Sequence, residues 1–193
     1  MTTPPAGGSG MAAVVLAAGA GRRFAAGIPK LRATVGGRPL VWWAATRALD
    51  SGVGPVWVVT GAAAVDDVLP PGVRTIHNAG WEQGQAGSLA VAVAEARRHR
   101  LHAVVVGLGD QPGIPADAWR AVAACDAPVA VATYGGRRRH PVKLGEAVWD
   151  LLPGDGDEGA RPLIRARPEL VAEVACEGNP DDIDTLEDLE RWS

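Results

Sequence analysis

Small residues and cations follow an apolar, β-prone run near the start of the chain. Residues Ala12 to Ala17 are apolar throughout, as a buried parallel strand requires, and Gly19 and Gly21 come soon after them. Glycine lacks a Cβ, so its backbone N–H group can approach a ligand closely. Arg23 and Lys30 then place positive charge where the loop opens. This combination predicts a pocket for a polyphosphate at the carboxyl end of a first strand.

Two better-known phosphate-binding loops do not fit this stretch. The dinucleotide fingerprint needs a third glycine where Phe24 stands, and no acidic residue closes a second strand about 20 residues later. The Walker A loop needs a Gly-Lys-Ser/Thr run, which the sequence lacks. From the residues alone, a glycine-rich turn without any ligand stays open as the simpler interpretation.

Carboxylates stand at two further places where a divalent cation can be held. Asp110 comes two residues after the apolar run His102 to Leu108, at the kind of strand end where open α/β sheets bind ligands. A carboxylate there is costly unless it coordinates something, and Mg²⁺ shared with phosphate is the usual solution. Asp184, in a short acidic run before a helix, is expected to complete the site, with Asp182 left open as the alternative. The other role open to these positions is capping of a turn or helix.

A long polar loop, residues 78–88, precedes a helix that we expect to span Ser88 to Arg100. Free N–H groups at the start of a helix accept anions or the oxygens of a base and a sugar, so Gly84 to Ser88 is a candidate ligand contact. Alternatively, its glycines only make turns and Ser88 only caps the helix. His140 is given no acid–base role, because a lone histidine more often packs or hydrogen-bonds.

The rest of the chain alternates apolar β-prone runs with helical patterns. Further strands are predicted at 55–60, 73–77, 129–133 and 170–175, and a hairpin turn at 134–137 leads into an antiparallel strand through Leu144. Helices are predicted at 39–49, 62–69, 115–125, 145–152 and 159–167, with a last helix opened by a capping box at Thr185 to Asp188. This alternation predicts an α/β fold: a three-layer, Rossmann-like, mostly parallel sheet with a late antiparallel hairpin insertion.

Length and charge narrow the class of protein. The 193 residues suit one α/β domain, here residues 11–193, and residues 1–10 have the composition of a disordered tail. A net charge of −3 argues against a nucleic-acid partner and against an anionic membrane surface. No stretch reaches the ~18–20 apolar residues of a membrane helix. Cys125 and Cys176 form no metal or redox motif, which fits a cytoplasmic setting.

Six motifs, in order along the chain, resemble those of small nucleotidyltransferases. The first runs from Leu16 to Phe24 with Pro29-Lys30 and resembles the signature Leu-Ala-Ala-Gly-x-x-x-Arg-Met…Pro-Lys. The others are Asn78…Trp81…Gly84…Ser88-Leu89, Gly109-Asp110-Gln111-Pro112, His140-Pro141-Val142, Gly156-Asp157-Glu158-Gly159-Ala160-Arg161 and Asp182-Ile183-Asp184-Thr185…Glu187-Asp188-Leu189. The resemblance covers roughly Ala12 to Leu189, and it is greatest to the molybdenum cofactor cytidylyltransferases.

The resemblance implies a reaction in which a terminal phosphate of an acceptor attacks the α-phosphorus of a nucleoside triphosphate and expels pyrophosphate. It implies CTP as the donor, a phosphorylated pterin such as molybdopterin as the acceptor, and Mg²⁺ as the cofactor. Ala18 stands where guanylyl-transferring relatives tend to have Gly, which favours cytosine. No side-chain nucleophile is required, because the acceptor phosphate is already ionised. Transient contact with proteins that mature molybdoenzymes is also expected.

The same resemblance assigns residues to each part of the site. Arg23, Lys30 and Asp110 are expected to be catalytic, and Asp110 and Asp184 to hold the metal. The nucleotide is expected to contact Leu16, Ala17, Ala18, Gly19, Gly21, Arg23, Lys30, Gly84, Ser88 and Asp110. The acceptor side is expected to include His140, Gly159 and Arg161.

Some residues depart from the family pattern. Phe24 replaces the usual Met, the loop between Arg23 and Lys30 is longer than usual, Leu186 replaces a familiar Pro, and Lys143 stands where an apolar residue is common. Three alternatives stay open. They are a guanylyl- or other nucleotidyltransferase with a different small phosphorylated acceptor, a nucleotide-binding partner in cofactor assembly without catalysis, and, more remotely, an NAD-dependent oxidoreductase.

Overall fold

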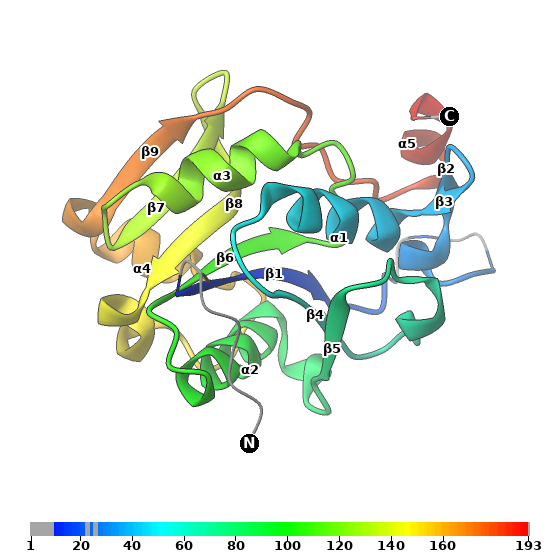
Figure 1. The fold of residues 1–193 in the computed structure, drawn as a ribbon. Coiled ribbons are helices and arrows are strands. Elements are labelled where there is room, and N and C mark those ends of the chain that lie inside the picture. The colour runs from blue at the N-terminus through cyan, green and yellow to red at the C-terminus, as the bar shows by residue number, and fades with distance from the viewer. Residues whose placement is uncertain (1–9, 22–23, 25–26, 193) are drawn as a thin grey trace.

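In the computed structural model, residues 10–21, 24 and 27–192 are described, and they form a seven-stranded sheet with helices on both faces (Figure 1). The strands are β1 (Met11–Ala17), β4 (Val56–Thr60), β5 (Val73–His77), β6 (Ala103–Leu108), β7 (Val129–Tyr134), β8 (Arg137–Gly145) and β9 (Val171–Ala175). They lie in the order β5-β4-β1-β6-β8-β7-β9, and neighbours are parallel except where β8 pairs with β6 and β7. The predicted mostly parallel α/β fold with a late antiparallel hairpin is confirmed.

Strand β1 lies in the interior of the sheet, where its side chains are apolar on both faces. Residues Ala12 to Ala17 are all buried, and the strand pairs in parallel with β4 on one edge and β6 on the other. Burial on both faces is what a parallel strand between two helical layers requires. The apolar runs predicted to be strands in the sequence are all strands in the structure.

The helices form the two outer layers (Figure 1). One face is covered by α1 (Leu40–Ser51) and α3 (Ala116–Ala124), the other by α2 (Gln85–Arg98) and α4 (Arg161–Ala166). Each face has its own apolar core: Val15 of β1 belongs to the core under α1 and α3, and Val14 to the core under α2. Alternate residues of the strand face opposite layers, as its period of two requires.

Two predicted helices are shorter and tighter than expected. Of residues 62–69 only Asp66–Val68 form a 3₁₀ turn, and residues Glu146–Leu151 form a 3₁₀ helix instead of an α-helix. In both places a proline follows, and the residue before it, Leu69 or Leu152, is extended (ψ of 151° and 142°). Proline disfavours the α conformation in the residue that precedes it, so both helical segments end before Leu69 and Leu152.

Helix α2 begins at Gln85, three residues before the predicted start at Ser88. The N–H of Ala86 donates to the carbonyl oxygen of Gly156 at 2.9 Å, so a distant loop satisfies a donor of the first turn. Ser88 therefore lies inside the helix, and its interpretation as the helix cap is wrong.

The hairpin of β7 and β8 carries a bulge. Val131 pairs with Val142, but the next residue, Ala132, pairs with Arg139, so His140 and Pro141 have no partner on β7. Extra residues on one strand bend it and re-aim its side chains. His140 lies two residues before Val142 and four before Leu144, and all three line a pocket described below.

Lys143 is buried on β8 on the side of α3. Its neighbours on the flanking strands, Val105 and Ala130, belong to the core under α1 and α3. Its ammonium donates to the backbone carbonyl of Cys125, just past the end of α3. A cation there satisfies a helix-end acceptor and opposes the negative end of the helix dipole. This accounts for a lysine where an apolar residue is common.

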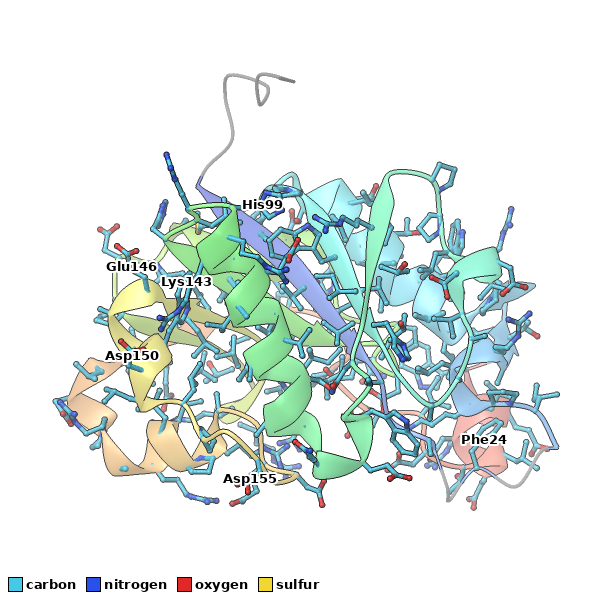
Figure 2. All side chains as sticks on the ribbon, turned by 90° about the horizontal axis from the view of Figure 1, so that it is seen from below. Phe24, His99, Lys143, Glu146, Asp150 and Asp155 are labelled. Atoms are coloured by element: carbon cyan, nitrogen blue, oxygen red, sulfur yellow. The ribbon has the colours of Figure 1, made fainter. Side chains whose placement is uncertain are left out.

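A small ribbon and the C-terminal segment pack together beside the sheet (Figure 1). The ribbon consists of β2 (Thr34–Val35) and β3 (Arg38–Pro39), and α5 (Leu186–Arg191) lies next to it. A third apolar cluster joins them: Ile183 is fully buried with Leu40 and Phe24. Figure 2 shows Phe24 at this side of the molecule, far from Asp155. Burial of Ile183 determines where the adjacent Asp184 lies.

The predicted capping box at the start of α5 is confirmed. Thr185 Oγ1 accepts from the N–H of Asp188 at 3.1 Å, and Asp188 Oδ2 accepts from the N–H of Thr185 at 2.9 Å. Asp188 Oδ2 also accepts from the N–H of Asp184 at 3.0 Å. The cap therefore fixes the backbone of Asp184 as well as the start of the helix.

The connections of the chain diverge between β1 and β6. From β1 the chain goes to β4 and β5 on one side, and it returns to β6 on the other side of β1. A crevice opens at the carboxyl ends of two such strands, because their connections lead away in opposite directions. Ala18 follows β1 and Asp110 follows β6 at this edge.

The predicted tail, residues 1–10, lies outside the described residues except for Gly10. Within the described ranges, no helix is long and apolar enough to cross a membrane. Cys125 and Cys176 are free thiols.

Replacing Ile183 with Ala tests whether the third apolar cluster holds the C-terminal segment. Removing the side chain of a fully buried isoleucine costs about 2–5 kcal/mol, and local release of residues 180–192 is the least costly response. We expect faster proteolysis of this segment and a lower melting temperature. Leu186→Ala, at a position that is 44% exposed, is the matched control and should change neither. Unchanged proteolysis of Ile183→Ala would show that other contacts hold the segment.

Candidate functional site

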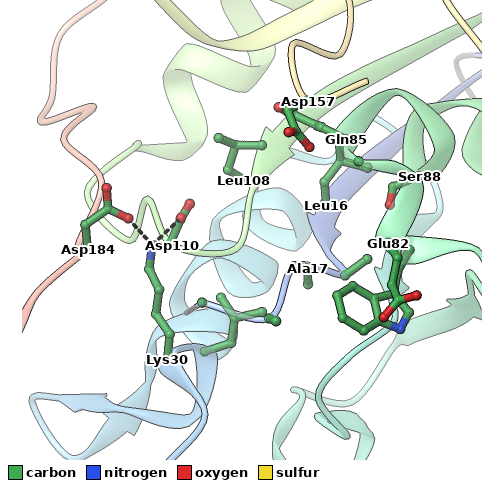
Figure 3. Close-up of a pocket in the computed structure, with 17 residues that line it drawn as sticks. Leu16, Ala17, Lys30, Glu82, Gln85, Ser88, Leu108, Asp110, Asp157 and Asp184 are labelled. Carbon is green, nitrogen blue, oxygen red and sulfur yellow. Dashed lines mark hydrogen bonds and ion pairs between the residues drawn. The ribbon is translucent and has the colours of Figure 1, made fainter. Parts of the chain in front are cut away.

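A pocket of about 540 Å³ opens at the carboxyl ends of β1 and β6 (Figure 3). Its lining comes from the end of β1 and the loop after it, the 3₁₀ turn Lys30–Arg32, the start of α2, the end of β6 and the C-terminal segment. The described lining residues are Leu16, Ala17, Ala18, Gly19, Ala20, Gly21, Lys30, Leu31, Trp81, Glu82, Gly84, Gln85, Ser88, Leu108, Asp110, Asp157 and Asp184. Every predicted nucleotide contact is among them except Arg23, which lies outside the described residues.

Lys30 joins the two predicted metal ligands. Its Nζ donates to Asp110 Oδ2 at 2.7 Å and to Asp184 Oδ1 at 2.5 Å (Figure 3). The lysine side chain is only 8% exposed, and the carboxylates are 24% and 30% exposed. The structure thus brings Lys30, Asp110 and Asp184 together, and the ammonium contacts the carboxylates. A contact between Lys30 and phosphate stays a prediction.

Separate elements position these three side chains. Asp110 follows β6, and its carbonyl oxygen accepts from the N–H of Ile183 at 3.0 Å, which ties the C-terminal segment to the end of that strand. Lys30 packs against Gly21: a Cβ on this glycine would come within 2.7 Å of the lysine Cβ. The longer loop before Lys30 therefore does not keep the lysine out of the pocket.

Neighbouring charges control the ionisation of Lys30. Burial alone would lower the pKa of Lys30, but the charges and hydrogen bonds of Asp110 and Asp184 outweigh burial and raise this pKa. Desolvation and the negative charge of Asp110 raise the pKa of Asp182. Lys30 is therefore charged at neutral pH. Of the two candidate partners of Asp110, Asp184 is the one that shares a cation with it.

The carboxylate pair fits a divalent cation. Oxygens of Asp110 and Asp184 converge on one ammonium, and Mg²⁺ is commonly held by one or two carboxylates together with phosphate oxygens and water. In the part of the chain that the structure describes, no three or more His, Cys, Asp or Glu side chains are grouped to hold a metal ion. The pair therefore suits a metal that arrives with phosphate better than one held by protein alone.

The two loop glycines differ in their surroundings. Gly21 has a φ of +59° and packs on Lys30, whereas a Cβ on Gly19 would meet none of the described residues within 4 Å. The free protein therefore requires glycine at position 21, and no described neighbour requires it at position 19.

Gly84 joins the first pocket to the segment around Gly156. Its φ is +93°, and a Cβ on it would approach the carbonyl oxygen of Gly156 and Asp157 Oδ1 to 2.5 Å. The N–H of Gly156 donates to the carbonyl oxygen of Gln83 at 2.9 Å. The loop before α2 and the segment of Gly156 are therefore tied together by close packing and a backbone hydrogen bond.

Ser88 has a supporting role in addition to lining the pocket. Its side chain is buried, and its hydroxyl accepts from Asn78 Nδ2 at 3.0 Å. Asn78 Oδ1 in turn accepts from the N–H of Gly80 at 3.0 Å. Ser88 thereby anchors the polar loop, and its hydroxyl can still donate toward the pocket.

A second pocket, of about 370 Å³, adjoins the first and shares Leu16, Gln85 and Leu108 with it. The predicted acceptor-side residues His140, Gly159 and Arg161 all line this second pocket. Its charged lining residues are four arginines and two carboxylates: Arg138, Arg139, Arg161, Arg165, Glu158 and Asp182. The second pocket is basic and therefore suits an anionic ligand.

The arginines of the second pocket are engaged to different degrees. Arg165 makes a two-pronged ion pair with Glu158 at 2.7 and 2.6 Å, and Arg138 binds Glu173 at 2.7 Å. Among the described residues, the Arg161 guanidinium has no hydrogen-bond or ion-pair partner. Arg161 is thus the arginine best placed to receive an anion.

His140 is neutral at physiological pH. Burial, together with the positive charges of Arg161 and Arg139, lowers the pKa of His140 to about 4. A neutral imidazole offers a hydrogen bond and carries no charge. That His140 has no acid–base role stays a prediction.

Several lining residues were not singled out from the sequence. Trp81, Asp157 and Gln111 stand within the quoted motifs, so the motifs were the available signal. Arg138 and Arg139 belong to no motif, and they stand just before the bulge in β8.

Comparison with known proteins identifies the family. Residues 13–172 match the MobA-like NTP transferase domain. The chain belongs to the MobA-like NTP transferase family. The predicted membership of the nucleotidyltransferases is thereby confirmed at the level of the family.

Relatives of this MobA-like NTP transferase are found both by sequence and by structure. The bifunctional protein GlmU of Anaeromyxobacter sp. (strain Fw109-5) is 34% identical over 175 residues, which cover 86% of this chain and 36% of that protein. The chain thus spans about a third of the length of this curated relative. The crystal structure of a homologue of Mycobacterium tuberculosis Rv0371c, from Mycobacterium sp. strain JC1, has a TM-score of 0.81 and 31% identity over 95% of both chains. Rv0371c from M. tuberculosis H37Rv in complex with manganese has a TM-score of 0.75 and 26% identity, and the match covers 94% of this chain and 97% of that one.

Alanine at Gly21 and at Gly19 separates the two roles of the glycines in this MobA-like NTP transferase. Gly21→Ala places a Cβ against Lys30 at a positive φ, so we expect a loss of about 1–3 kcal/mol in stability without ligand. Gly19→Ala should leave that stability unchanged and weaken triphosphate binding about tenfold, because the new methyl group keeps phosphate from the backbone. Thermal unfolding and calorimetric titration measure both. Wild-type triphosphate affinity in Gly19→Ala would contradict a close backbone approach at Gly19.

Proposed function

We propose that the protein transfers a nucleoside monophosphate, CMP by preference, from a nucleoside triphosphate to a phosphorylated pterin of the molybdopterin type. One observation carries the proposal: two pockets of opposite charge character adjoin at the ends of β1 and β6, with Lys30 and the carboxylate pair in the first. The family supports a nucleoside triphosphate as the donor. The choice of CTP and of a pterin rests on the sequence motifs.

In this proposal the first pocket holds the triphosphate. Gly19 leaves its backbone open to phosphate oxygens, and Lys30 offers a compact charge on a flexible stem. Arg23 keeps, on sequence grounds, its proposed role as a bidentate phosphate ligand. Asp110 and Asp184 would hold Mg²⁺, which when bound neutralises phosphate charge and makes the α-phosphorus more electrophilic. The manganese complex of a relative supports a divalent metal.

The proposed reaction forms one phosphorus–oxygen bond and breaks another. An oxygen of the acceptor phosphate bonds to the α-phosphorus, and the bond from that phosphorus to the oxygen bridging to the β-phosphate breaks. Pyrophosphate leaves with the electron pair. The protein contributes positioning and charge: Lys30 stays with the negative charge as it moves to pyrophosphate, and Arg161 holds the attacking phosphate.

The second pocket is proposed to hold the acceptor. Its apolar floor suits a fused ring and includes Leu89, Val106, Val131, Val142, Leu144 and Ile164. The arginines at its rim suit a phosphate group, and neutral His140 offers a hydrogen bond to a pterin heteroatom. Transient contact with proteins that mature molybdoenzymes, and a cytoplasmic location, belong to the same proposal because both depend on this acceptor.

Ala18 is proposed to influence the choice of base. It is buried, and its carbonyl oxygen accepts from the N–H of Ala62 at 3.0 Å. A Cβ on Gly61 would come within 2.9 Å of the Ala18 Cβ and 2.6 Å of the Trp81 Cβ, so these residues are closely packed. The Ala18 methyl group narrows this side of the first pocket, which favours the smaller pyrimidine ring.

The alternatives make different predictions in the same assay. A guanylyltransferase would use GTP best, and a nucleotide-binding partner without catalysis would release no pyrophosphate with any nucleotide. Because the curated relative is a GlmU protein, the acceptors offered should include phosphorylated sugars as well as molybdopterin.

Asp110→Asn tests the carboxylate pair in catalysis. The substitution preserves shape and removes a charge that the metal needs, so we expect kcat for pyrophosphate release to fall more than about a hundredfold with an unchanged fold. Asp126→Asn, at an exposed position away from both pockets, is the matched control and should keep wild-type turnover. Near-normal turnover of Asp110→Asn with Mg²⁺ would exclude Asp110 as a metal ligand.

Ala18→Gly tests the choice of base. Removing the methyl group widens the first pocket beside Trp81, so the wild type should bind CTP most tightly of the four nucleotides and the variant should gain affinity for GTP. A methyl group in a pocket is worth about 1–3 kcal/mol, so the CTP-to-GTP ratio should fall at least about tenfold. Titration calorimetry with each nucleotide measures this. Tighter binding of GTP by the wild type would reverse the assignment of CTP and leave the family unaffected.

A further inference from the structure

Lys30 occupies the position that a metal between Asp110 and Asp184 would need. Its Nζ lies within hydrogen-bond distance of both carboxylates, and the side chain is almost fully buried. A divalent cation bound to the same two oxygens would lie within a few ångströms of the ammonium. Like charges at such a distance repel strongly in a partly buried site. Lys30 and a metal ion therefore compete for these two oxygens.

We propose that Lys30 is an internal counter-ion that competes with the divalent metal, and that the metal binds with high affinity only when a triphosphate draws the lysine away. The competition follows from the geometry above. The part played by the triphosphate rests on the proposed function.

The charges around the first pocket support this exchange. Among its described lining residues, Lys30 is the single cation, and the same lining includes four carboxylates: Glu82, Asp110, Asp157 and Asp184. Two of these, Asp110 and Asp184, contact the ammonium directly, so a divalent cation bound to the same oxygens has to displace it. The affinity of the pair for metal is therefore limited by displacing Lys30.

The lysine has a route to a second partner. The base of the lysine side chain packs against Gly21, and the four-carbon side chain of a lysine is intrinsically flexible. Both Lys30 and Gly19 line the first pocket. A triphosphate bound there replaces the anionic partners that the lysine gives up. Metal and triphosphate then bind with positive cooperativity, because each makes the other's position available.

Mn²⁺ alone, followed by electron paramagnetic resonance on the nucleotide-free full chain, tests the competition. Lys30→Met keeps the length of the side chain and removes its charge, so we expect it to bind Mn²⁺ at least tenfold more tightly than the wild type. Lys143→Met changes the other lysine of the chain, which lines neither pocket, and should leave Mn²⁺ affinity at the wild-type value. The double variant Lys30→Met/Asp184→Asn should lose the gain, because the metal then lacks one carboxylate.

Thermal unfolding gives a second measurement that needs no turnover. Lys30→Met should melt below the wild type in the absence of metal, because the two carboxylates lose their counter-ion, and Mn²⁺ should raise its melting temperature more than it raises that of the wild type. Lys30→Gln serves in the same way if the methionine variant does not fold. Equal Mn²⁺ affinity of the wild type and both Lys30 variants would overturn the competition.

The outcomes separate this inference from the proposed function. Tighter Mn²⁺ binding by Lys30→Met, combined with a wild type that releases no pyrophosphate from any nucleotide, would support the counter-ion and refute the enzyme. Pyrophosphate release by the wild type, combined with no gain of Mn²⁺ affinity in the Lys30 variants, would support the enzyme and refute the counter-ion.

Discussion

The shared ammonium of Lys30 is the contact on which the site depends. A partly buried pair of carboxylates repel each other unless a cation lies between them, and the cation here comes from a residue 80 positions from Asp110 and 154 from Asp184. Three elements must therefore meet at one point: the turn after the first loop, the end of β6, and the C-terminal segment. Burial of Ile183 and the contact between Gly21 and Lys30 are the packing that makes them meet.

The two pockets are adjacent, and backbone hydrogen bonds also link the segments that line them. Gly84 faces the first pocket, and the segment of Gly156 leads into Gly159 and Arg161 of the second pocket. These two stretches share hydrogen bonds at 2.9 Å and leave no room for a Cβ at Gly84. A ligand that shifts the start of α2 must therefore also shift the rim of the second pocket. Such coupling lets occupancy of one pocket influence the geometry of the other.

The strands and their parallel arrangement were predictable from local signals in the sequence, and the family resemblance supplied His140, Gly159 and Arg161 of the second pocket. Apolar runs mark strands, the carboxyl ends of parallel strands share one edge, and Thr185 with Asp188 marks a cap. What the sequence missed depends on distant contacts. The start of α2 depends on a hydrogen bond from Ala86 to Gly156, and the pairing of Lys30 with carboxylates depends on the positions of three elements at once. The 3₁₀ segments before Pro70 and Pro153 were open to prediction, because proline acts on its neighbour.

The distribution of charge between the pockets bears on how a protein with a net charge of −3 would accommodate the two anionic ligands of the proposed reaction. The second pocket carries more arginines than carboxylates and can attract a phosphate directly. The described lining of the first pocket carries more carboxylates than cations. A divalent cation that arrives with the polyphosphate would give these carboxylates a partner. In the proposed function, the described lining of the first pocket therefore suits a metal–polyphosphate complex, and in the free protein Lys30 supplies the cation that the carboxylate pair contacts.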